Sequence, residues 1–253
     1  MLRAMDDEGN WLVRNGETGL CNLITDAFLY AARQTQTGAD IALHNSGGIR
    51  ANIPAGEITF EKAYNVLPFV NTLCIVEVSG QTILDELEMG ARLAPGNSRS
   101  LLHASGMTYV INATIPSSVI IDEEDLFVGV SGDRRVCNVL VNGEPIDPEK
   151  SYKVVSTNYS LRDKGDGHMF RGAVQLEPDF VMYYDAFADY LKTFDAIPDY
   201  YAESEGRIQI LTENILAPAA KRELIKPLLF WESEEETLTT KITPLIHPSG
   251  EFS

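Results

Sequence analysis

Apolar residues recur at helical spacing in three long stretches of the chain. Residues 19–34, GLCNLITDAFLYAARQ, place their apolar side chains on one face, and Thr37-Gly38 follows as a stop signal. Residues 81–94, QTILDELEMGARLA, and 178–193, PDFVMYYDAFADYLKT, repeat the pattern. A shorter helix is expected in TFEKAYNVLPF, where Thr59 is a suitable N-cap. The pattern therefore predicts a helix at each of these places.

Apolar runs of strand length separate the helices. They are Ile41–His44, NTLCIVEVSG (71–80), GMTYVINA (106–113), RRVCNVLVNGEPID (134–147) and SYKVVSTN (151–158). Asn142-Gly143 is a strong signal for a hairpin turn, so the strands around it are antiparallel. Helices alternate with strands in both halves, which predicts an α+β (mixed α/β) class rather than a purely parallel doubly wound sheet.

Composition and charge narrow the classes of function. With 253 residues and 44% hydrophobic residues, the chain can bury a core in one large domain or two small ones. The 37 acidic and 20 basic residues give a formal net charge of -17, which disfavours nucleic acid as a partner. A nucleotide needs a few arginines to form a local positive site. No apolar run is long enough to span a membrane, and MLRAMDDEGNW has no signal-peptide core, so no membrane partner is expected and the compartment stays open.

The first glycine loop is HNSGGIR, residues 44–50, directly after a predicted strand. Gly47 and Gly48 allow backbone N–H groups to approach a ligand without hindrance from Cβ atoms. Arg50 can pair with a phosphate or carboxylate, and Asn45 adds a polar side chain at the end of the strand. The alternative is a tight turn with a surface arginine.

The second glycine loop lies in STNYSLRDKGDGHMF, residues 156–170, and also follows a strand. Asp166 stands between Gly165 and Gly167, where its carboxylate can accept hydrogen bonds from two vicinal hydroxyls of a sugar. In a plain loop the same residue would only favour the turn. Tyr159 and His168 flank it. Two glycine loops at strand ends predict a cleft built from two sides.

Three ordered motifs resemble the C-terminal domain of the 5'-nucleotidase family, which includes the UDP-sugar hydrolases. They are RNGETGLCNLITDA, HNSGGIRANIPAGEITFEKAYNVLPFVNTL and STNYSLRDKGDG. The resemblance implies a duplicated four-layer α/β/β/α fold, often found in periplasmic or cell-surface proteins. It divides the chain into a lead-in (1–13), a nucleotide-binding domain (14–211) and a C-terminal extension (212–253).

The resemblance also implies a set of substrate-binding residues. Phe69 and Tyr159 match the two aromatic rings that hold the base, and such stacking contributes roughly 1–3 kcal/mol. Arg14 and Arg50 match arginines near the phosphate, and Asp166 matches the carboxylate that takes the ribose hydroxyls. The complete expected set is Arg14, Asn45, Gly47, Gly48, Arg50, Phe69, Tyr159 and Asp166.

Signals for catalysis are weak in this sequence. In the family, a separate N-terminal metallophosphatase domain holds two metal ions through histidine-rich motifs. The sequence contains no Gly-Asn-His or Gly-His-x-His motif, and its four histidines form no HxH or HxxxH pair. We therefore expect no catalytic residue and no metal in this chain. Divalent metals of the Mn, Zn or Mg class are expected only in a catalytic domain outside it.

Three hypotheses of function remain open at this point. The first is a specificity domain of a 5'-nucleotidase-like phosphohydrolase, which binds an AMP-like or UDP-sugar-like ligand and has a metallophosphatase domain as its partner. The second is a free-standing nucleotide-binding or interaction module, for which the acidic run ESEEE in the C-terminal extension is a hint. The third is a self-contained hydrolase that uses His44 or His168 with Asp166 as acid and base.

Overall fold

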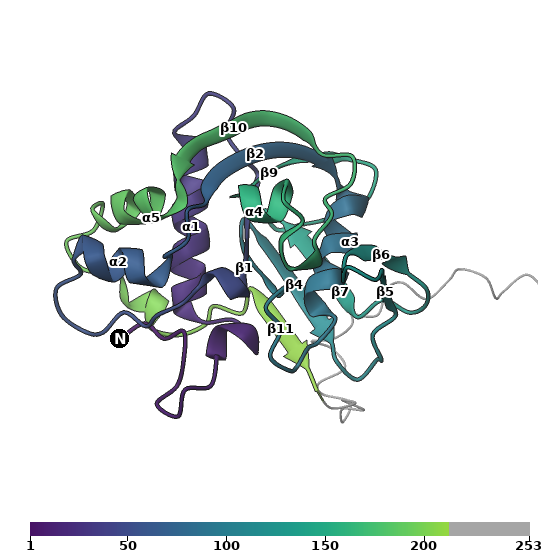
Figure 1. Ribbon diagram of the computed structural model, residues 1–253, viewed down its shortest axis with the longest axis horizontal. Helices are drawn as coiled ribbons and strands as arrows, with labels where there is room; N and C mark the ends of the chain where they lie inside the picture. The colour runs from purple at the N-terminus through teal and green to yellow at the C-terminus, as the bar shows by residue number, and fades with distance from the viewer. Residues whose placement is uncertain (213–253) are drawn as a thin grey trace, which may run out of the picture. The chain divides into compact units, whose positions relative to one another are not determined.

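A five-stranded mixed sheet forms the centre of the computed structural model, which describes residues 1–212 (Figure 1). Its strands are β1 (Ile41–Asn45), β2 (Thr72–Ser79), β3 (Leu102–Ser105), β9 (Ser151–Thr157) and β10 (Val174–Met182), in the spatial order β10-β2-β9-β1-β3. Strands β1 and β9 are parallel, whereas β2 is antiparallel to both β9 and β10. Because β1 and β9 run in the same direction, the loops that follow them emerge at the same edge of the sheet.

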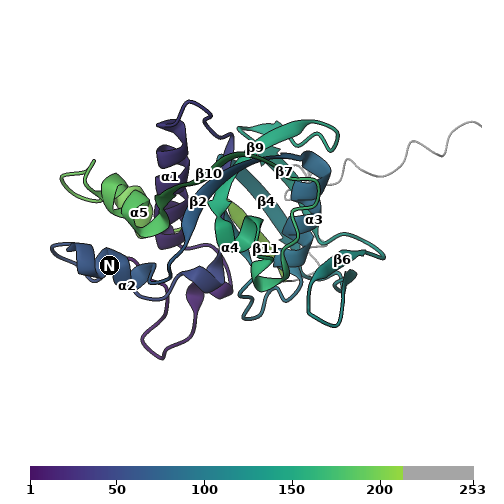
Figure 2. The same cartoon turned by 45° about the horizontal axis from the view of Figure 1, so that its top comes forward.

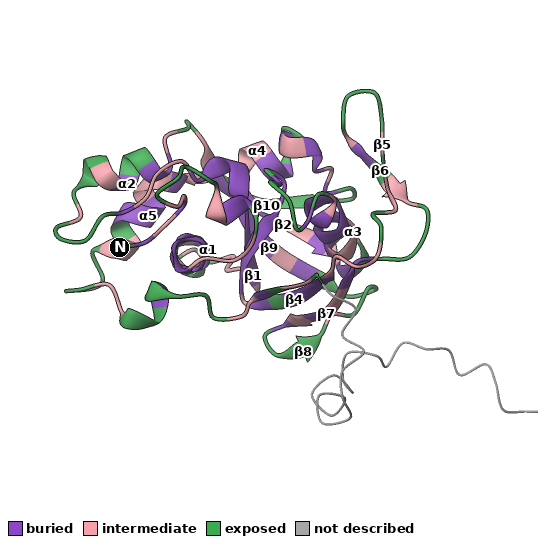
Figure 3. Cartoon of the chain, turned by 90° about the horizontal axis from the view of Figure 1, so that it is seen from below, coloured by how far each residue is buried: buried purple, intermediate pink, exposed green. Residues whose placement is uncertain are grey.

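Both faces of this sheet are covered, which explains the continuous apolar run of β1. Ala42 faces a core shared with helices α1 (Gly19–Arg33), α2 (Phe60–Val66) and α5 (Tyr183–Leu191). Ile41 and Leu43 face a second core, shared with helix α3 (Gly80–Ala91) and another sheet. Figure 3 shows α1 end-on beside β1, with buried residues along both elements. Alternate side chains of one strand thus enter two different cores.

The second sheet has four strands in the order β11-β4-β7-β8. These are β4 (Met107–Asn112), β7 (Val136–Val141), β8 (Glu144–Pro145) and β11 (Ile208–Leu211), and a separate pair joins β5 (Val119–Ile121) to β6 (Phe127–Val130). Asn142 and Gly143 turn β7 into β8 with φ of 51° and 86°, as the hairpin signal predicted. The mixed α/β class predicted from the sequence is confirmed.

Threonine or serine side chains cap α1, α2 and α3, whereas α5 begins without a side-chain cap. Thr59 accepts a hydrogen bond from the backbone N–H of Lys62 and caps α2, as predicted, and Thr18 caps α1 in the same way. The short helices are α4 (Asn158–Leu161) and the 3₁₀ turns η1 (Leu12–Arg14), η2 (Ser46–Gly48), η3 (Gly165–Gly167) and η4 (Asp199–Ala202). In Figures 1 and 2, α4 lies beneath the curved strands β2 and β9, which it contacts.

The predicted helix over 178–193 is wrong in its first five positions. Residues 178–182 complete β10, and α5 begins only at Tyr183. Strand β10 is the edge of the five-stranded sheet and pairs with β2 through an irregular register. An edge strand tolerates Pro178, because one row of its N–H groups has no partner strand.

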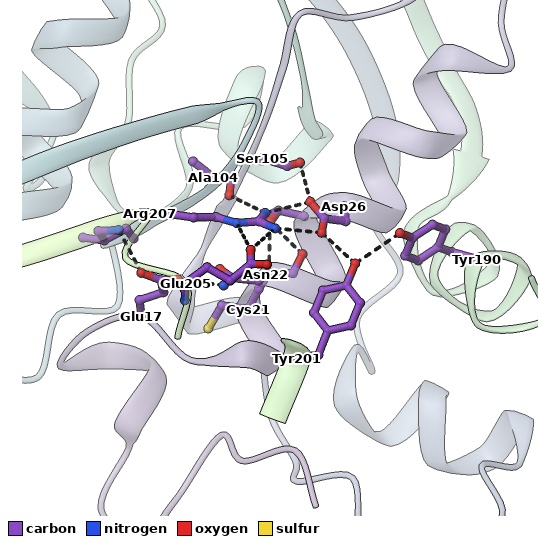
Figure 4. A network of polar contacts seen from close by, with 12 residues as sticks. Glu17, Cys21, Asn22, Asp26, Ala104, Ser105, Tyr190, Tyr201, Glu205 and Arg207 are labelled. Carbon is purple, nitrogen blue, oxygen red and sulfur yellow. Dashed lines mark hydrogen bonds and ion pairs between the residues drawn. The ribbon is translucent and has the colours of Figure 1, made fainter. Parts of the chain in front are cut away.

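A polar network fastens the C-terminal end of the described chain to α1 (Figure 4). Arg207 Nη1 and Nη2 donate to the two carboxylate oxygens of Asp26 at 2.7 and 2.8 Å, and the Tyr201 hydroxyl donates to Asp26 Oδ2 at 2.7 Å. Glu17, two residues before the start of α1, accepts the backbone N–H of Ile208 at 2.9 Å. Strand β11 is therefore held by side chains in and just before α1 as well as by its pairing with β4.

Residues 1–212 all belong to one compact unit. The segment before Arg14 takes part in it, since Leu2 and Ala4 belong to the first core and Leu2 pairs with Ile53. The predicted C-terminal extension lies, from residue 213 onward, outside the described residues. Within the described part of the chain, no helix has the length and apolar character that crossing a membrane requires.

Candidate functional site

The two glycine loops meet at Asp166. Asn45, the last residue of β1, donates from Nδ2 to Asp166 Oδ2 at 2.6 Å, although 121 positions separate them in the chain. Ser160 Oγ donates to the amide oxygen of Asn45 at 3.4 Å, which fixes the direction of the amide. Strands β1 and β9 are parallel neighbours, so their C-terminal ends bring both loops to one edge of the sheet.

Glycine is needed at this junction because the loops pack too closely for a side chain. A Cβ atom on Gly47 would lie 2.8 Å from Asp166 Oδ2, and one on Gly165 would lie 2.2 Å from the ring of Tyr159. Gly48 packs against His44 in the same way, with a Cβ position 2.6 Å from the imidazole. The glycines noted in the sequence thus serve a close approach of backbone to side chain.

Tyr159 closes one side of the Asp166 carboxylate. Its hydroxyl donates to Asp166 Oδ1 at 3.4 Å and accepts the backbone N–H of Asp166 at 3.3 Å. Burial and then the negative charge of Asp166 raise the pKa of Tyr159, so the phenol stays protonated at neutral pH. The hydroxyl of this half-buried ring therefore has a partner on the loop that it covers.

A cavity of about 130 Å³ opens at this junction. Its walls are Asn45, Gly47, Gly48, Phe69, Asn71, Arg99, Tyr159 and Asp166. Phe69 lies in the segment between α2 and β2, and its backbone N–H donates to the Tyr183 hydroxyl at 2.7 Å. The residue is nevertheless 44% exposed. Phe69 thus presents a partly exposed aromatic ring to the cavity.

Arg14 and Arg50 do not line the cavity but form a stack next to it. The Arg14 and Arg50 guanidinium carbons lie 4.1 and 5.2 Å from the ring centroid of Trp11, and Arg50 also lies 5.8 Å from that of Phe69. Burial, followed by the charges of Arg50 and Arg99, lowers the pKa of Arg14. These arginines make a local positive region in a chain of net charge -17.

Arg99 and Asn71 are cavity residues that the sequence reasoning missed. Arg99 approaches the site from the loop after α3, and its Nη2 lies 3.6 Å from Asp166 Oδ1. Its surroundings in the sequence, GNSRS, contain no ligand motif. Only the folded chain brings Arg99 to the glycine loops.

His168 is a buried structural residue and does not face the cavity. Its Nδ1 lies 2.9 Å from Glu86 Oε2, and its Nε2 lies 2.9 Å from the carbonyl oxygen of Ser100. Asp166 and His168 have the spacing of an Asp-x-His metal motif, but their side chains have different partners. Among residues 1–212, no group of three or more His, Cys, Asp or Glu side chains can hold a metal ion.

His44 is also buried, beneath the first glycine loop. Its ring packs edge-on against Phe28 at 5.1 Å, and neither ring nitrogen has a hydrogen-bond partner within the described residues. Burial, with a smaller effect of His103, lowers the pKa of His44 to about 3. Within residues 1–212, no hydrogen bond or ion pair joins Asp166 to His44 or His168, so the geometry gives no support to the third hypothesis.

Comparisons with known proteins agree on one family. The family model for the 5'-nucleotidase C-terminal domain matches residues 5–172. Trifunctional nucleotide phosphoesterase protein YfkN of Bacillus subtilis is 30% identical over 182 residues, which are 71% of this chain and 12% of that protein. Protein UshA of Escherichia coli is 27% identical over 140 residues, which are 55% of this chain and 22% of that protein.

A solved structure supports the same assignment. The 5'-nucleotidase precursor of Thermus thermophilus is 36% identical, with a TM-score of 0.67 over 80% of this chain and 37% of that chain. The chain thus spans well under half the length of each of these relatives. A family model that covers most of the chain, together with this structural likeness, identifies the chain as a member of the 5'-nucleotidase C-terminal domain family.

Proposed function

We propose that this domain binds a nucleoside or nucleotide in the cavity at Asp166 and serves as the specificity domain of a 5'-nucleotidase-type phosphohydrolase. One observation carries the proposal. Phe69, Tyr159 and Asp166 come from two segments far apart in the sequence and line a single cavity. Two aromatic rings and a carboxylate are the groups that a base and a ribose require.

The base is proposed to stack between Phe69 and Tyr159. Phe69 already has an exposed ring and a backbone held by Tyr183, so little rearrangement is needed to accept a flat ligand. Stacking on aromatic rings tolerates several bases, since every base has a π face. The proposed contact therefore favours a nucleoside without selecting adenine or uracil.

The ribose and phosphate are proposed to lie on opposite sides of this stack. Asp166 accepts hydrogen bonds from Asn45 and Tyr159, and its two carboxylate oxygens have further acceptor sites for ribose hydroxyls. The Arg50 guanidinium lies beside the ring of Phe69, and both Arg50 and Arg14 lie against the ring of Trp11. A phosphate or diphosphate of an AMP-like or UDP-sugar-like ligand would find its positive partners there.

Hydrolysis is proposed to require a metallophosphatase domain that carries Mn, Zn or Mg class ions. Residues 1–212 offer no cluster that fits such ions, so no catalytic step is assigned to them. Its relatives include a trifunctional nucleotide phosphoesterase and a 5'-nucleotidase precursor, both much longer than the matched region.

Isothermal titration of the 253-residue chain with adenosine, AMP and UDP-glucose tests the proposal. Phe69→Ala should weaken each ligand that binds by about 1–3 kcal/mol, the contribution of a base stack. Phe60→Ala is the matched control, because Phe60 is an exposed aromatic residue of α2 that does not line this cavity. Equal affinities of the wild type and Phe69→Ala, or no saturable binding of any ligand, would contradict the proposed site.

A further inference from the structure

Glu86 is a buried carboxylate on the helix that packs into the second core. It lies in the middle of α3, is 1% exposed, and sits among the residues of the second core. A buried carboxylate is tolerated only where hydrogen bonds replace its hydration. The structural role of Glu86 therefore follows from the groups that donate hydrogen bonds to its carboxylate.

All hydrogen-bond partners of the Glu86 carboxylate in the described structure come from one short segment, residues 168–170. Oε1 accepts the backbone N–H groups of Met169 at 3.1 Å and Phe170 at 2.8 Å, and Oε2 faces His168 Nδ1 at 2.9 Å. This segment begins two residues after Asp166. If it moved away, the carboxylate would be left buried without partners, so Glu86 fixes the exit of the second glycine loop.

His168 extends this anchor to the segment that carries Arg99. Its two ring nitrogens face two acceptors, Glu86 Oε2 and the Ser100 carbonyl oxygen. His168 thus ties α3, the Asp166 loop and the residue next to Arg99 to one another.

The loop between these anchors has a conformation that needs support. The backbones of Lys164 and Asp166 are left-handed, with φ values of 57° and 52°. Residues other than glycine rarely adopt this conformation. Tyr159 packs against the entry of the loop at Gly165, and Glu86 holds its exit. The position of the Asp166 carboxylate thus depends on contacts at both ends.

We propose that Glu86 and His168 are positioning residues for ligand recognition, which act by holding the Asp166 carboxylate where it reads the ribose hydroxyls. The inference rests on the proposed function. Neither residue touches the ligand. Their effect should fall mainly on the sugar, because Glu86 forms its side-chain hydrogen bonds with residues 168–170 and with neither aromatic residue of the proposed stack.

The test compares Kd for adenosine and 2'-deoxyadenosine, and its readout is the ratio of the two. In the wild type, adenosine should bind about tenfold more tightly, since a hydrogen bond to a charged group contributes at least that factor. Glu86→Gln should reduce the preference to below about threefold, and it should weaken 2'-deoxyadenosine less than adenosine, because only the 3'-hydroxyl of the deoxy sugar loses its partner. A residue that only stabilised the fold would lower both affinities together.

The same helix provides a matched control. Glu88 is also fully buried on α3, but it accepts the backbone N–H of Val136 at 2.8 Å and does not contact residues 168–170. Glu88→Gln should keep the preference for the ribose. His168→Gln, which leaves the backbone contacts of Glu86 in place, is the second test variant. Circular dichroism before each titration verifies that the variant is folded.

A double-mutant cycle separates this inference from the proposed function. Asp166→Asn should abolish the preference for the ribose. Adding Glu86→Gln to this variant should not change the ratio of the two Kd values further, because both substitutions act through the Asp166 carboxylate. If Asp166→Asn removes the preference but Glu86→Gln and His168→Gln both retain it, the positioning role is refuted and the proposed site stands. If the wild type shows no preference, or Asp166→Asn leaves it unchanged, the proposed ribose contact and this inference both fail.

Discussion

Replacing Asp26 by asparagine removes the central charge of the network that joins α1 to β11. The carboxylate accepts from both terminal nitrogens of Arg207 and from the hydroxyls of Tyr201 and Ser105. The Asp26 and Arg207 side chains are only 17% and 15% exposed, so water replaces the lost partner poorly. Asparagine keeps the shape but leaves the guanidinium near a neutral amide.

The expected loss of stability is about 2–4 kcal/mol at pH 7. Removing one partner of a buried ion pair typically costs about 3–5 kcal/mol. The loss here should be somewhat smaller, because Arg207 retains Glu205 as a second carboxylate partner. Urea unfolding of the variant, followed by circular dichroism, measures the difference.

The loss should also depend on pH. Burial by itself would raise the pKa of Asp26, but the hydrogen bonds and charge of Arg207, with Ser105 and Tyr201, hold it below its ordinary value. A carboxyl with a lowered folded-state pKa stabilises the fold above its unfolded pKa of about 3.9, and this contribution disappears as the pH falls through the folded value. The gap between wild type and Asp26→Asn should therefore narrow below about pH 4.

Asp189→Asn is the control for this prediction. Asp189 also pairs with a basic residue, Lys192, but the two side chains are 65% and 73% exposed, and such pairs contribute at most about 1 kcal/mol. An Asp26→Asn effect no larger than that of Asp189→Asn, or one that stays constant from pH 7 to pH 3, would refute the assigned role of the network.

The remaining predictions concern ligand binding. Gly47→Ala should weaken adenosine by about 1–3 kcal/mol, because the new methyl group would lie 2.8 Å from Asp166 Oδ2 and displace the carboxylate. Gly16→Ala, whose Cβ would meet only one atom at 3.9 Å, should leave the affinity unchanged, and equal titration results for the two variants would contradict the close packing. Trp11→Ala should weaken AMP by about 0.5–2 kcal/mol more than adenosine, since the ring orients the arginines, and equal losses would assign Trp11 to the fold alone. Tyr159→Phe should weaken adenosine by about 0.5–1.5 kcal/mol through the lost hydroxyl contact, and a calorimetric loss above about 3 kcal/mol would mean that the ring itself had moved.

Local features of the chain could be predicted from the sequence because their causes are local. The apolar faces of α1 and α3, the cap at Thr59 and the hairpin at Asn142-Gly143 depend on residues within a few positions of one another. The wrong helix prediction for residues 178–182 also comes from local reasoning. The apolar residues at 180–182 fit a helical period as well, and they form a strand because β10 pairs with β2.

The candidate site was predictable in part. The two glycine loops and the aromatic residues Phe69 and Tyr159 follow from motifs, and the structure gathers them around one cavity. That Arg14 and Arg50 stack on Trp11 beside this cavity, while Arg99 enters it, could not be read from the sequence. The paths of the loops that carry these arginines depend on distant packing.

The sequence by itself determined where strands end in glycine loops and which chemical groups those loops carry. The tertiary structure alone decided which of those groups meet. Asn45 and Asp166 are 121 positions apart, and Glu86 and His168 are 82 apart. No local preference couples such residues. They meet because β1 and β9 are parallel neighbours and because α3 packs its buried carboxylate against the segment that leaves the second loop.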